Sequence, residues 1–145
     1  MPEAPVIVRI CNWEEACSDA RRVRELVFVL EQGVPVELEW DEWEPRSDHA
    51  LAYAGEKIVG TGRLLPDGHI GRMAVLKAWR GRGVGGALLL ALIGQARRKG
   101  HAAAVLNAQF YAAGFYRRYG FEKVGQEFIE VGIPHVVMRL ALHSA

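Results

Sequence analysis

Residues 80–86 read Arg-Gly-Arg-Gly-Val-Gly-Gly, and this glycine-rich loop constrains the chain more than any other segment. An expected strand at residues 70–75 runs into the loop, and an expected helix at residues 83–99 leaves it. Glycine has no Cβ, so main-chain amides can turn toward a ligand, and the first N–H groups of a helix attract anions. Arg80 and Arg82 add charge-assisted donors. The loop predicts a cradle for a pyrophosphate, although a tight strand-to-helix turn without a ligand is the alternative.

Two nucleotide-binding motifs are excluded for this loop. Gly81, Gly83 and Gly86 satisfy the pattern GxGxxG. That fingerprint belongs to the first βαβ unit of a fold and has an acidic residue about 20 positions later. Here the loop lies past the middle of the chain, and the following strand ends in AVLNAQ, which contains no Asp or Glu. No Gly-Lys-Ser/Thr closes the loop either, so a Walker loop does not fit.

The order of the expected elements predicts an α+β fold. We expect a mostly antiparallel sheet of about six to seven strands, flanked by helices and containing one central βαβ crossover. The first helix should run from Ser18 or Asp19 to residue 31, with Val23, Leu26, Val27 and Leu30 on its apolar face. The strands are expected at residues 6–10, 49–54, 57–64, 70–75, 102–106, 121–128 and 135–142, and the later helices at residues 83–99 and 112–119. The continuous apolar run at residues 102–106 is typical of a strand buried on both faces.

Composition excludes several classes of protein. A length of 145 residues fits one domain, residues 1–145. Eighteen basic against 17 acidic residues leave no excess of positive charge for nucleic acid, and the longest apolar run, residues 87–93, is too short to cross a membrane. Cys11 and Cys17 are the only cysteines, and no zinc spacing occurs. We therefore expect a cytoplasmic protein without a signal peptide or a metal.

The pattern Arg-x-x-Gly-x-Gly, here Arg80, Gly83 and Gly85, resembles the acetyl-coenzyme A signature of the GNAT superfamily of N-acetyltransferases. The surrounding segments also match: RMAV before the loop, a long helix and a buried strand after it, and then AGFYRRYGF. The segments VFVLEQGVP (27–35) and GIPHVVM (132–138) are similar to the ElaA-like branch. The resemblance covers essentially the whole chain and implies a GNAT-like fold with acetyl-coenzyme A as the cofactor. One departure is Gly114, where relatives often have proline.

The resemblance also implies a set of site residues. Main-chain groups of the strand at residues 73–75 would bind the pantetheine arm, and the Val75 amide would polarise the thioester carbonyl. Tyr116 would protonate the leaving sulfur, and Asn107 would touch the pantetheine. The alternatives without a catalytic or binding role are that residues 73–75 are core strand residues, that Tyr116 is a half-buried tyrosine and that Asn107 only ends its strand. The cofactor-binding residues implied in this way are Met73, Ala74, Val75, Arg80, Gly81, Arg82, Gly83, Val84, Gly85, Gly86, Asn107 and Tyr116.

Acetyl transfer to an amine needs few further groups. The amine must lose a proton, the oxyanion needs donors and the thiolate benefits from an acid, but no covalent nucleophile is required. The residues leave the general base open. Its candidates are Glu31, Asp41 and His49, with Glu44, His135 or an ordered water as alternatives. Histidine exchanges protons near neutral pH, and a carboxylate beside Trp40 or Trp43 could have a raised pKa, whereas most such carboxylates are solvated loop charges.

The acidic stretch at residues 37–44 favours a cationic acceptor, such as a polyamine, an aminoglycoside or a lysine side chain. Its two tryptophans could instead cap the core or form a dimer contact. The acceptor would be a small-molecule or protein amine, and the resemblance implies a homodimer. Two other functions are weighed: a sensor that binds acyl-coenzyme A without transferring the acyl group, and an RNA-binding domain using the arginine-glycine loop. The near-neutral charge disfavours the second.

Overall fold

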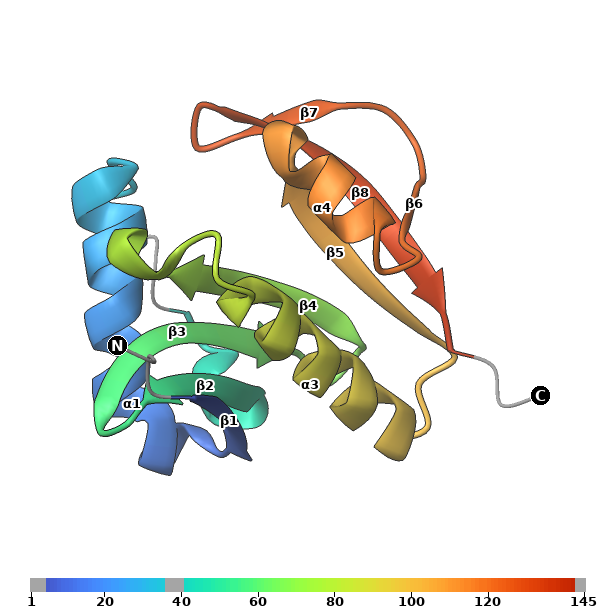
Figure 1. Ribbon diagram of the computed structural model, residues 1–145. Helices are drawn as coiled ribbons and strands as arrows, with labels where there is room; N and C mark the ends of the chain where they lie inside the picture. Colours follow the sequence, from blue (N-terminus) through green and yellow to red (C-terminus); the bar gives the residue numbers. More distant parts are fainter. Residues whose placement is uncertain (1–4, 36–40, 143–145) are drawn as a thin grey trace.

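One eight-stranded sheet organises the chain in the computed structural model, which describes residues 5–35 and 41–142 (Figure 1). Its strand order is β1-β2-β3-β4-β5-β8-β6, with β7 pairing with β8. All neighbouring strands are antiparallel except β4 and β5, which α3 connects. The strands are β1 (Val6–Cys11), β2 (Asp48–Ala54), β3 (Lys57–Leu64), β4 (His69–Val75), β5 (Ala103–Gln109), β6 (Glu122–Lys123), β7 (Phe128–Glu130) and β8 (Ile133–Ala141).

The expected α+β architecture with one βαβ crossover is confirmed. The sheet exceeds the expected strand number because the strand predicted at residues 121–128 is reduced to the short strand β6, and a second short strand, β7, begins at Phe128. Gly125, with φ of 84°, lies between them and turns the chain out of the extended conformation. The helical segments are α1 (Trp13–Arg24), η1 (Glu25–Glu31), η2 (Glu44–Arg46), η3 (Lys77–Trp79), α3 (Val84–Arg98), η4 (Phe110–Ala112) and α4 (Ala113–Arg117).

The first helix begins at Trp13, so the predicted start at Ser18 or Asp19 is wrong. Asn12 is its N-cap, and the Asn12 side chain accepts a hydrogen bond from the Glu15 N–H at 2.9 Å. An asparagine directly after a strand satisfies one of the donors that a helix start leaves open, and acidic residues in the first turn suit the dipole. This cap therefore starts the helix one residue after β1 ends.

The helix continues as a π-helical segment, η1, and this changes its apolar face. Val23 and Val27 are buried as predicted, but Leu26 and Leu30 are 41% and 68% exposed. A π-helix has i→i+5 hydrogen bonds and a wider turn, so side chains after residue 25 rotate away from the 3.6-residue pattern. The prediction for Leu26 and Leu30 is wrong for this reason. The same rotation places Phe28 against the cavity described below.

Helix α3 agrees with its prediction within one residue at each end. The helix lies against one face of the sheet (Figure 1), and its apolar stripe is buried in the core. Burial of each such leucine or isoleucine side chain stabilises the fold by about 1.5–3 kcal/mol. The stripe therefore anchors the glycine loop, which directly precedes the helix. The buried residues of the stripe are Leu88, Leu89, Leu92 and Ile93.

Strands β4 and β5 pair only at their first residues, His69 with Val105 and Ile70 with Leu106. Beyond that point the two strands diverge (Figure 1). In β4, Arg72 and Met73 together oppose a single residue of β3, which is a β-bulge, and Arg72 has φ of 48°. The bulge bends β4 where the strands begin to separate. The fold therefore opens a gap in the middle of its own sheet.

Strand β5 is not buried on both faces, contrary to its prediction. Ala104, Leu106 and Ala108 are buried, whereas Asn107 between them is exposed. The gap beside β5 leaves one of its faces uncovered, so its side chains alternate. Of the helix predicted at residues 112–119, only Ala113–Arg117 is α-helical (α4), and the 3-10 turn η4 directly precedes it. Among residues 5–35 and 41–142, no helix combines the length and apolar character needed to cross a membrane.

Candidate functional site

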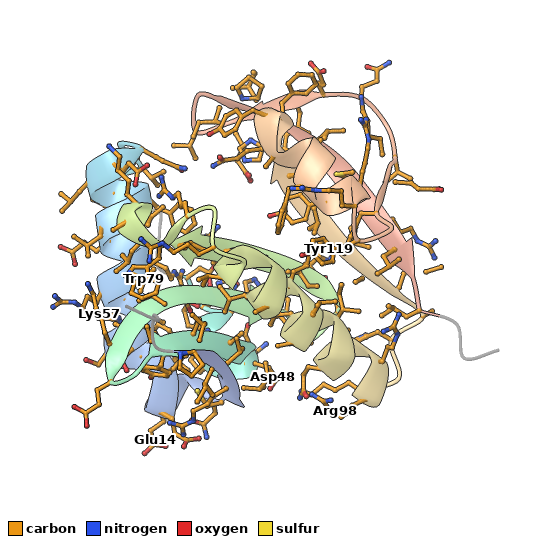
Figure 2. All side chains as sticks on the ribbon, viewed as in Figure 1. Glu14, Asp48, Lys57, Trp79, Arg98 and Tyr119 are labelled. Atoms are coloured by element: carbon orange, nitrogen blue, oxygen red, sulfur yellow. The ribbon has the colours of Figure 1, made fainter. Side chains whose placement is uncertain are left out.

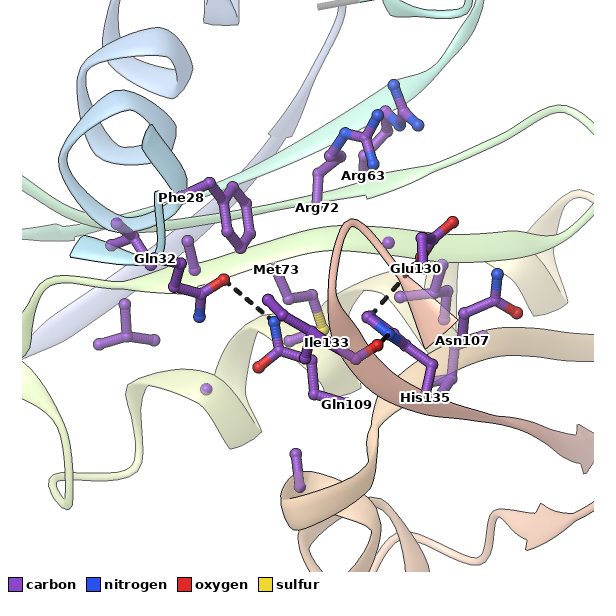
Figure 3. Close-up of a pocket in the computed structure, with 18 of the residues that line it drawn as sticks. Phe28, Gln32, Arg63, Arg72, Met73, Asn107, Gln109, Glu130, Ile133 and His135 are labelled. Atoms are coloured by element: carbon purple, nitrogen blue, oxygen red, sulfur yellow. Dashed lines mark hydrogen bonds and ion pairs between the residues drawn. The ribbon is translucent and has the colours of Figure 1, made fainter. Parts of the chain in front are cut away.

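A cavity of about 840 Å³ occupies the gap between β4 and β5 (Figure 3). Its wall combines residues from η1, β4, α4, β5 and β8, so segments far apart in the chain meet there. Eight of the sequence-predicted site residues contribute to the wall, namely Glu31, Met73, Ala74, Val75, Arg80, Gly85, Asn107 and Tyr116. Seven predicted residues are not part of it, namely Asp41, His49, Gly81, Arg82, Gly83, Val84 and Gly86.

The cavity passes through the sheet from one face to the other. A Cβ on Gly62 would lie 2.8 Å from Leu92 of α3, so Gly62 faces α3. Side chains alternate along a strand, and Arg63 therefore points to the opposite face. We call the wall formed by Val75, Arg80, Gly85, Phe115 and Tyr116 the glycine-loop end, and the wall formed by Arg63 and Arg72 the arginine end.

The glycine loop has both used and unused N–H groups, and the Arg80 N–H donates to the Lys77 carbonyl at 3.3 Å. Gly81 and Gly83 have φ of 76° and 84°, a left-handed conformation that favours glycine. Gly83 is the N-cap of α3, and its carbonyl accepts the first helical bond from the Ala87 N–H at 3.0 Å. Within the described part of the chain, no main-chain carbonyl accepts a hydrogen bond from the N–H groups of residues 83–86. These donors and the positive end of the helix dipole are suited to an anion.

Other groups of the loop are already engaged by the protein itself. Arg80 donates from its two Nη atoms to the Glu31 carboxylate at 2.6 and 2.7 Å, and from Nε to the Val75 carbonyl at 3.0 Å. The Arg82 guanidinium lies 5.0 Å from the centre of the Trp79 ring. Gly86 packs against the Tyr119 hydroxyl, which leaves no room for a Cβ. Arg80 therefore ties η1 to the end of β4, and Gly86 allows close packing.

Tyr119 lies between α3 and the part of the molecule formed by α4, β5 and β8 (Figure 2). Its ring is 5.3 Å from that of Phe115, which in turn approaches Gly85. These contacts fix the position of α4 relative to the glycine loop. Tyr116, which precedes Tyr119 by less than one helical turn, is thereby held at the cavity wall.

The main chain of β4 offers further donors at the gap. The Leu76 N–H donates to the Val59 carbonyl of β3 at 2.9 Å. Main-chain groups of successive strand residues point to alternate sides, so those of Val75 and Met73 face the gap, while those of Ala74 face β3. Of the three residues predicted at this position, Met73 and Val75 thus direct main-chain groups toward the cavity.

Tyr116 lines the glycine-loop end and is half-buried. Its ring lies 5.1 Å from the Phe115 ring and 6.1 Å from the Phe121 ring. Burial raises the pKa of Tyr116 to about 12, because the apolar surroundings disfavour the phenolate. The hydroxyl therefore keeps its proton at neutral pH and can donate it.

The three base candidates named from the sequence are each bound to other groups. His49 is buried, its Nε2 lies 2.9 Å from the Glu44 carbonyl, and burial lowers its pKa. Burial would raise the pKa of Asp41, but the hydrogen bond from Arg63 at 2.8 Å lowers it. The Arg80 hydrogen bonds lower the pKa of Glu31. Only Glu31 of the three contacts the cavity.

His135 of β8 is a cavity residue with a defined proton arrangement (Figure 3). Its Nδ1 lies 2.7 Å from the Ile133 carbonyl, which can only accept a hydrogen bond, so Nδ1 carries a proton and donates it there. Nε2 lies 3.6 Å from the Glu130 carboxylate. His135 was named from the sequence only as an alternative candidate for the general base. Its register opposite Gln109 brings it into the gap.

Two further features of the cavity have no local sequence signal. The Gln109 side chain donates to the Gln32 side chain at 3.1 Å and so bridges β5 and η1 across the gap (Figure 3). At the arginine end, Arg63 and Arg72 both contact Asp41, at 2.8 and 3.4 Å. Both features join residues more than 20 positions apart, so a spacing pattern does not reveal them.

Behind the arginine end lies a buried ion pair. Arg24 donates to Glu44 through two bonds of 3.0 and 2.6 Å, and Arg63 lies 3.1 Å from the same carboxylate. Burial would raise the pKa of Glu44, but the hydrogen bonds from Arg24 and Arg63 lower it. Asp41 and Glu44 are thus paired with arginines, which weakens the expected attraction of this stretch for a cationic acceptor. Residues 37–40, including Trp40, lie outside the described residues.

Comparison with known proteins places this geometry in a family. Residues 19–142 match the family described as "Acetyltransferase (GNAT) domain". The chain is 46% identical to an uncharacterized N-acetyltransferase of Bacillus subtilis, YjcF, over 89% of this chain and 95% of the relative. It is 30% identical to the protein ElaA of Escherichia coli, over 81% and 82%. The crystal structure of an acyl-CoA N-acyltransferase from Pseudomonas aeruginosa is similar, with 28% identity, a TM-score of 0.85 and coverage of 94% and 100%.

Proposed function

Because the chain belongs to the GNAT family of acetyltransferases, ElaA among its relatives, we propose that it transfers the acetyl group of acetyl-coenzyme A to a primary amine. The chain is an acyltransferase, and acetyl-coenzyme A is its cofactor. One observation supports the proposed reaction most strongly. A single cavity connects the end of the glycine loop with Tyr116 and with the open edge of β4.

We assign the cofactor to the glycine-loop end. The diphosphate would accept hydrogen bonds from the N–H groups of residues 83–86, and the helix dipole of α3 favours its negative charge. The pantetheine arm would enter the gap beside Met73 and Val75, whose main-chain groups face it. Asn107 lies across the gap on β5. Arg80 acts indirectly here, because its bonds to Glu31 and Val75 hold the end of β4 in place.

The reaction proceeds by direct attack. The amine nitrogen attacks the thioester carbon, and the Val75 N–H stabilises the oxyanion that forms. The C–N bond forms and the C–S bond breaks, so the electron pair leaves on sulfur. Tyr116 donates its proton to this sulfur, and Nε2 of His135 accepts the proton that the amine loses.

A thermal-shift titration with acetyl-coenzyme A tests the cofactor site. We expect the wild-type melting temperature to rise and Gly85→Glu to abolish the rise, because a carboxylate there would repel the diphosphate. Gly85 lies in the first turn of α3, without a positive φ, so the added glutamate is compatible with folding. Leu90→Glu, at an exposed position of the same helix, adds the same charge away from the cavity and should leave the rise unchanged. No response of the wild type at millimolar acetyl-coenzyme A contradicts the proposal.

The release of free thiol with a panel of amines tests transfer itself. We expect His135→Gln to lower the rate of thiol release, since glutamine fills a similar space but cannot accept the proton that the amine loses. His101→Gln, outside the cavity, is the matched control. The alternative function, a sensor of acyl-coenzyme A, predicts binding without thiol release on any amine.

We also propose the domain organisation, the compartment and the oligomeric state of the protein. Residues 1–145 form one acetyltransferase domain in this proposal. A reducing, cytoplasmic compartment is supported by Cys11 and Cys17, which are free thiols. The homodimer implied by the sequence resemblance stays a prediction, and sedimentation equilibrium tests it.

A further inference from the structure

We propose that the acceptor is a small amine that also carries a carboxylate, and that this carboxylate binds Arg63 and Arg72 at the arginine end of the cavity. The inference rests on the proposed function, because it names the acceptor for the same site. It departs from the cationic acceptor that the acidic stretch at residues 37–44 suggested. Three observations support it: an unused donor on Arg63, the strained backbone that positions Arg72, and the pairing of Glu31 with Arg80.

Arg63 is a buried arginine with an incomplete set of partners. It is 5% exposed and forms part of the cavity wall. Its Nη1 contacts Asp41 at 2.8 Å and Glu44 at 3.1 Å, yet no group in the described part of the chain accepts from its Nε. A buried donor without an acceptor is destabilising and rare in folded proteins. A carboxylate bound to Nε and an adjacent Nη through two parallel bonds would satisfy it.

Arg72 is brought to the same place by a strained backbone. It has φ of 48°, although a residue with a Cβ disfavours this conformation. Its Nη2 contacts the same Asp41 carboxylate as Arg63, at 3.4 Å, so the two guanidinium groups are neighbours (Figure 3). Such strain persists only where surrounding structure maintains it, and it gathers at functional sites. The bulge thus adds a second cation beside Arg63.

The carboxylate nearest the glycine-loop end already has a partner. Glu31 is bound by Arg80 through two hydrogen bonds, whereas Glu130 is half exposed to solvent and lies 3.6 Å from Nε2 of His135, beyond hydrogen-bonding distance. A second ammonium group at Glu31 would therefore have to compete with Arg80. An anionic group on the acceptor instead meets arginines. The charges on this wall favour an amino acid over a diamine.

The distance between the two ends sets the length of the acceptor. Gly71, which pairs with Arg63, precedes Val75 by four residues, so the levels of Arg63 and Val75 are at most about 13 Å apart along β4. The attacking amine must lie beside Val75, where the thioester carbonyl would bind. This upper limit admits acceptors with several methylene groups between the amine and the carboxylate. An ω-amino acid with several methylene groups can span the cavity.

Acetylation of matched amines by the wild-type protein tests the proposal. The probes are 6-aminohexanoate and 8-aminooctanoate, compared with the alkylamines and the diamines of equal length. We expect kcat/KM for the amino acids to exceed that for the alkylamines by about 10- to 100-fold, the range expected for a hydrogen-bonded charge. Equal values, or a preference for the diamines, would overturn the proposal.

Two variants locate the effect. Arg72→Gln and Arg63→Gln should each lose most of the preference for the amino acids while still acetylating the alkylamines. Arg72→Gln is informative even where Arg63→Gln fails to fold, because Arg72 is only partly buried. Arg22→Gln, on the exposed face of α1, should keep the full preference. An unchanged preference in both cavity variants would contradict the assignment of the carboxylate to this end.

A binding measurement separates this inference from the proposed function. With coenzyme A present, 8-aminooctanoate should raise the wild-type melting temperature, and Arg72→Gln should remove that increase. Binding without thiol release supports the anion site and contradicts the proposed transfer. Thiol release from alkylamines, with neither binding nor preference for the amino acids, contradicts the anion site alone.

Discussion

The glycine-loop end and the arginine end of the cavity are built in different ways. The first comes largely from consecutive residues, a loop followed by the helix α3, with α4 added by the packing of Tyr119 on Gly86. The second consists of Arg63 and Arg72 from two strands, which contact Asp41 and the buried Arg24–Glu44 pair of other segments. A local motif can bind a ligand that a whole family shares. A site for a particular acceptor depends on contacts between distant segments.

An arginine–glutamate pair lies near each end, and the two pairs differ in burial. The side chains of Arg24 and Glu44 are 1% and 4% exposed, whereas those of Arg80 and Glu31 are 40% and 38% exposed. Both pairs have two short hydrogen bonds. Water screens the exposed pair, while a partner lost from the buried pair leaves an uncompensated charge. The two pairs have similar hydrogen-bond geometry, but the loss of one partner should lower the free energy of unfolding much more for the buried pair than for the exposed pair.

Glu44→Ala is expected to lower the free energy of unfolding by about 3–5 kcal/mol. The substitution leaves Arg24 and Arg63 buried without their shared carboxylate. Urea unfolding followed by circular dichroism measures the loss. Glu44→Gln, which keeps hydrogen-bonding atoms, should lose less. A loss near zero for the alanine variant would mean that the buried pair contributes no more than an exposed one.

Tyr116→Phe is expected to lower kcat by about 100-fold, because the departing sulfur loses its proton donor. The ring contacts with Phe115 and Phe121 remain, so stability should change little. Thiol release under saturating acetyl-coenzyme A gives kcat, and thermal unfolding is the control. A kcat within about 2- to 3-fold of the wild type would mean that Tyr116 is not the proton donor.

Gly86→Ala is expected to lower the free energy of unfolding by about 1–3 kcal/mol, because its Cβ would meet Tyr119. The substitution lies at the glycine-loop end, but it acts on the packing of Tyr119 and not on a residue of the proposed reaction. Combining it with Tyr119→Phe, which removes the hydroxyl nearest to the Cβ, should recover part of the loss. Chemical unfolding of the two single variants and the double variant measures this coupling. Strict additivity of the two losses would argue against the contact.

Acid should weaken the arginine end through Glu44. Its folded-state pKa lies below the ordinary value of 4.5, so the stability that it contributes is complete above pH 4.5 and is lost as the pH falls through the folded pKa. Urea unfolding of the wild type at neutral pH and at a series of lower pH values measures the slope. Glu44→Gln, which cannot titrate, should reduce this slope. An unchanged slope would assign the acid sensitivity to other carboxylates.

Glu31→Gln is expected to change the free energy of unfolding by about 1 kcal/mol or less, since its pair with Arg80 is exposed. Its effect on the binding of acetyl-coenzyme A should be larger than its effect on stability, because the Arg80 side chain also donates to the Val75 carbonyl. We expect a weaker thermal response to acetyl-coenzyme A, with Glu25→Gln on the same segment as the control. A loss of stability as large as that of Glu44→Ala would contradict the comparison of the two pairs.

Local patterns were sufficient for much of the fold. The stripe of Leu88, Leu89, Leu92 and Ile93 predicted α3, and the glycines before it predicted a turn between β4 and this helix. Those inferences succeeded because their physical cause acts between neighbours in the chain. They failed where the cause was a change of local geometry that periodicity does not encode, as in the π-helical turn that exposes Leu26 and Leu30.

What the amino-acid order specifies unaided is a strand, a glycine loop and an amphipathic helix that follow one another in the chain. Long-range packing adds the rest. The bulge at Arg72, the separation of β4 from β5 and the entry of His135 into the gap all depend on which strands become neighbours. Hydrogen bonds and ion pairs between distant residues are decided only when the sheet closes, because each needs partners whose positions no spacing in the chain defines.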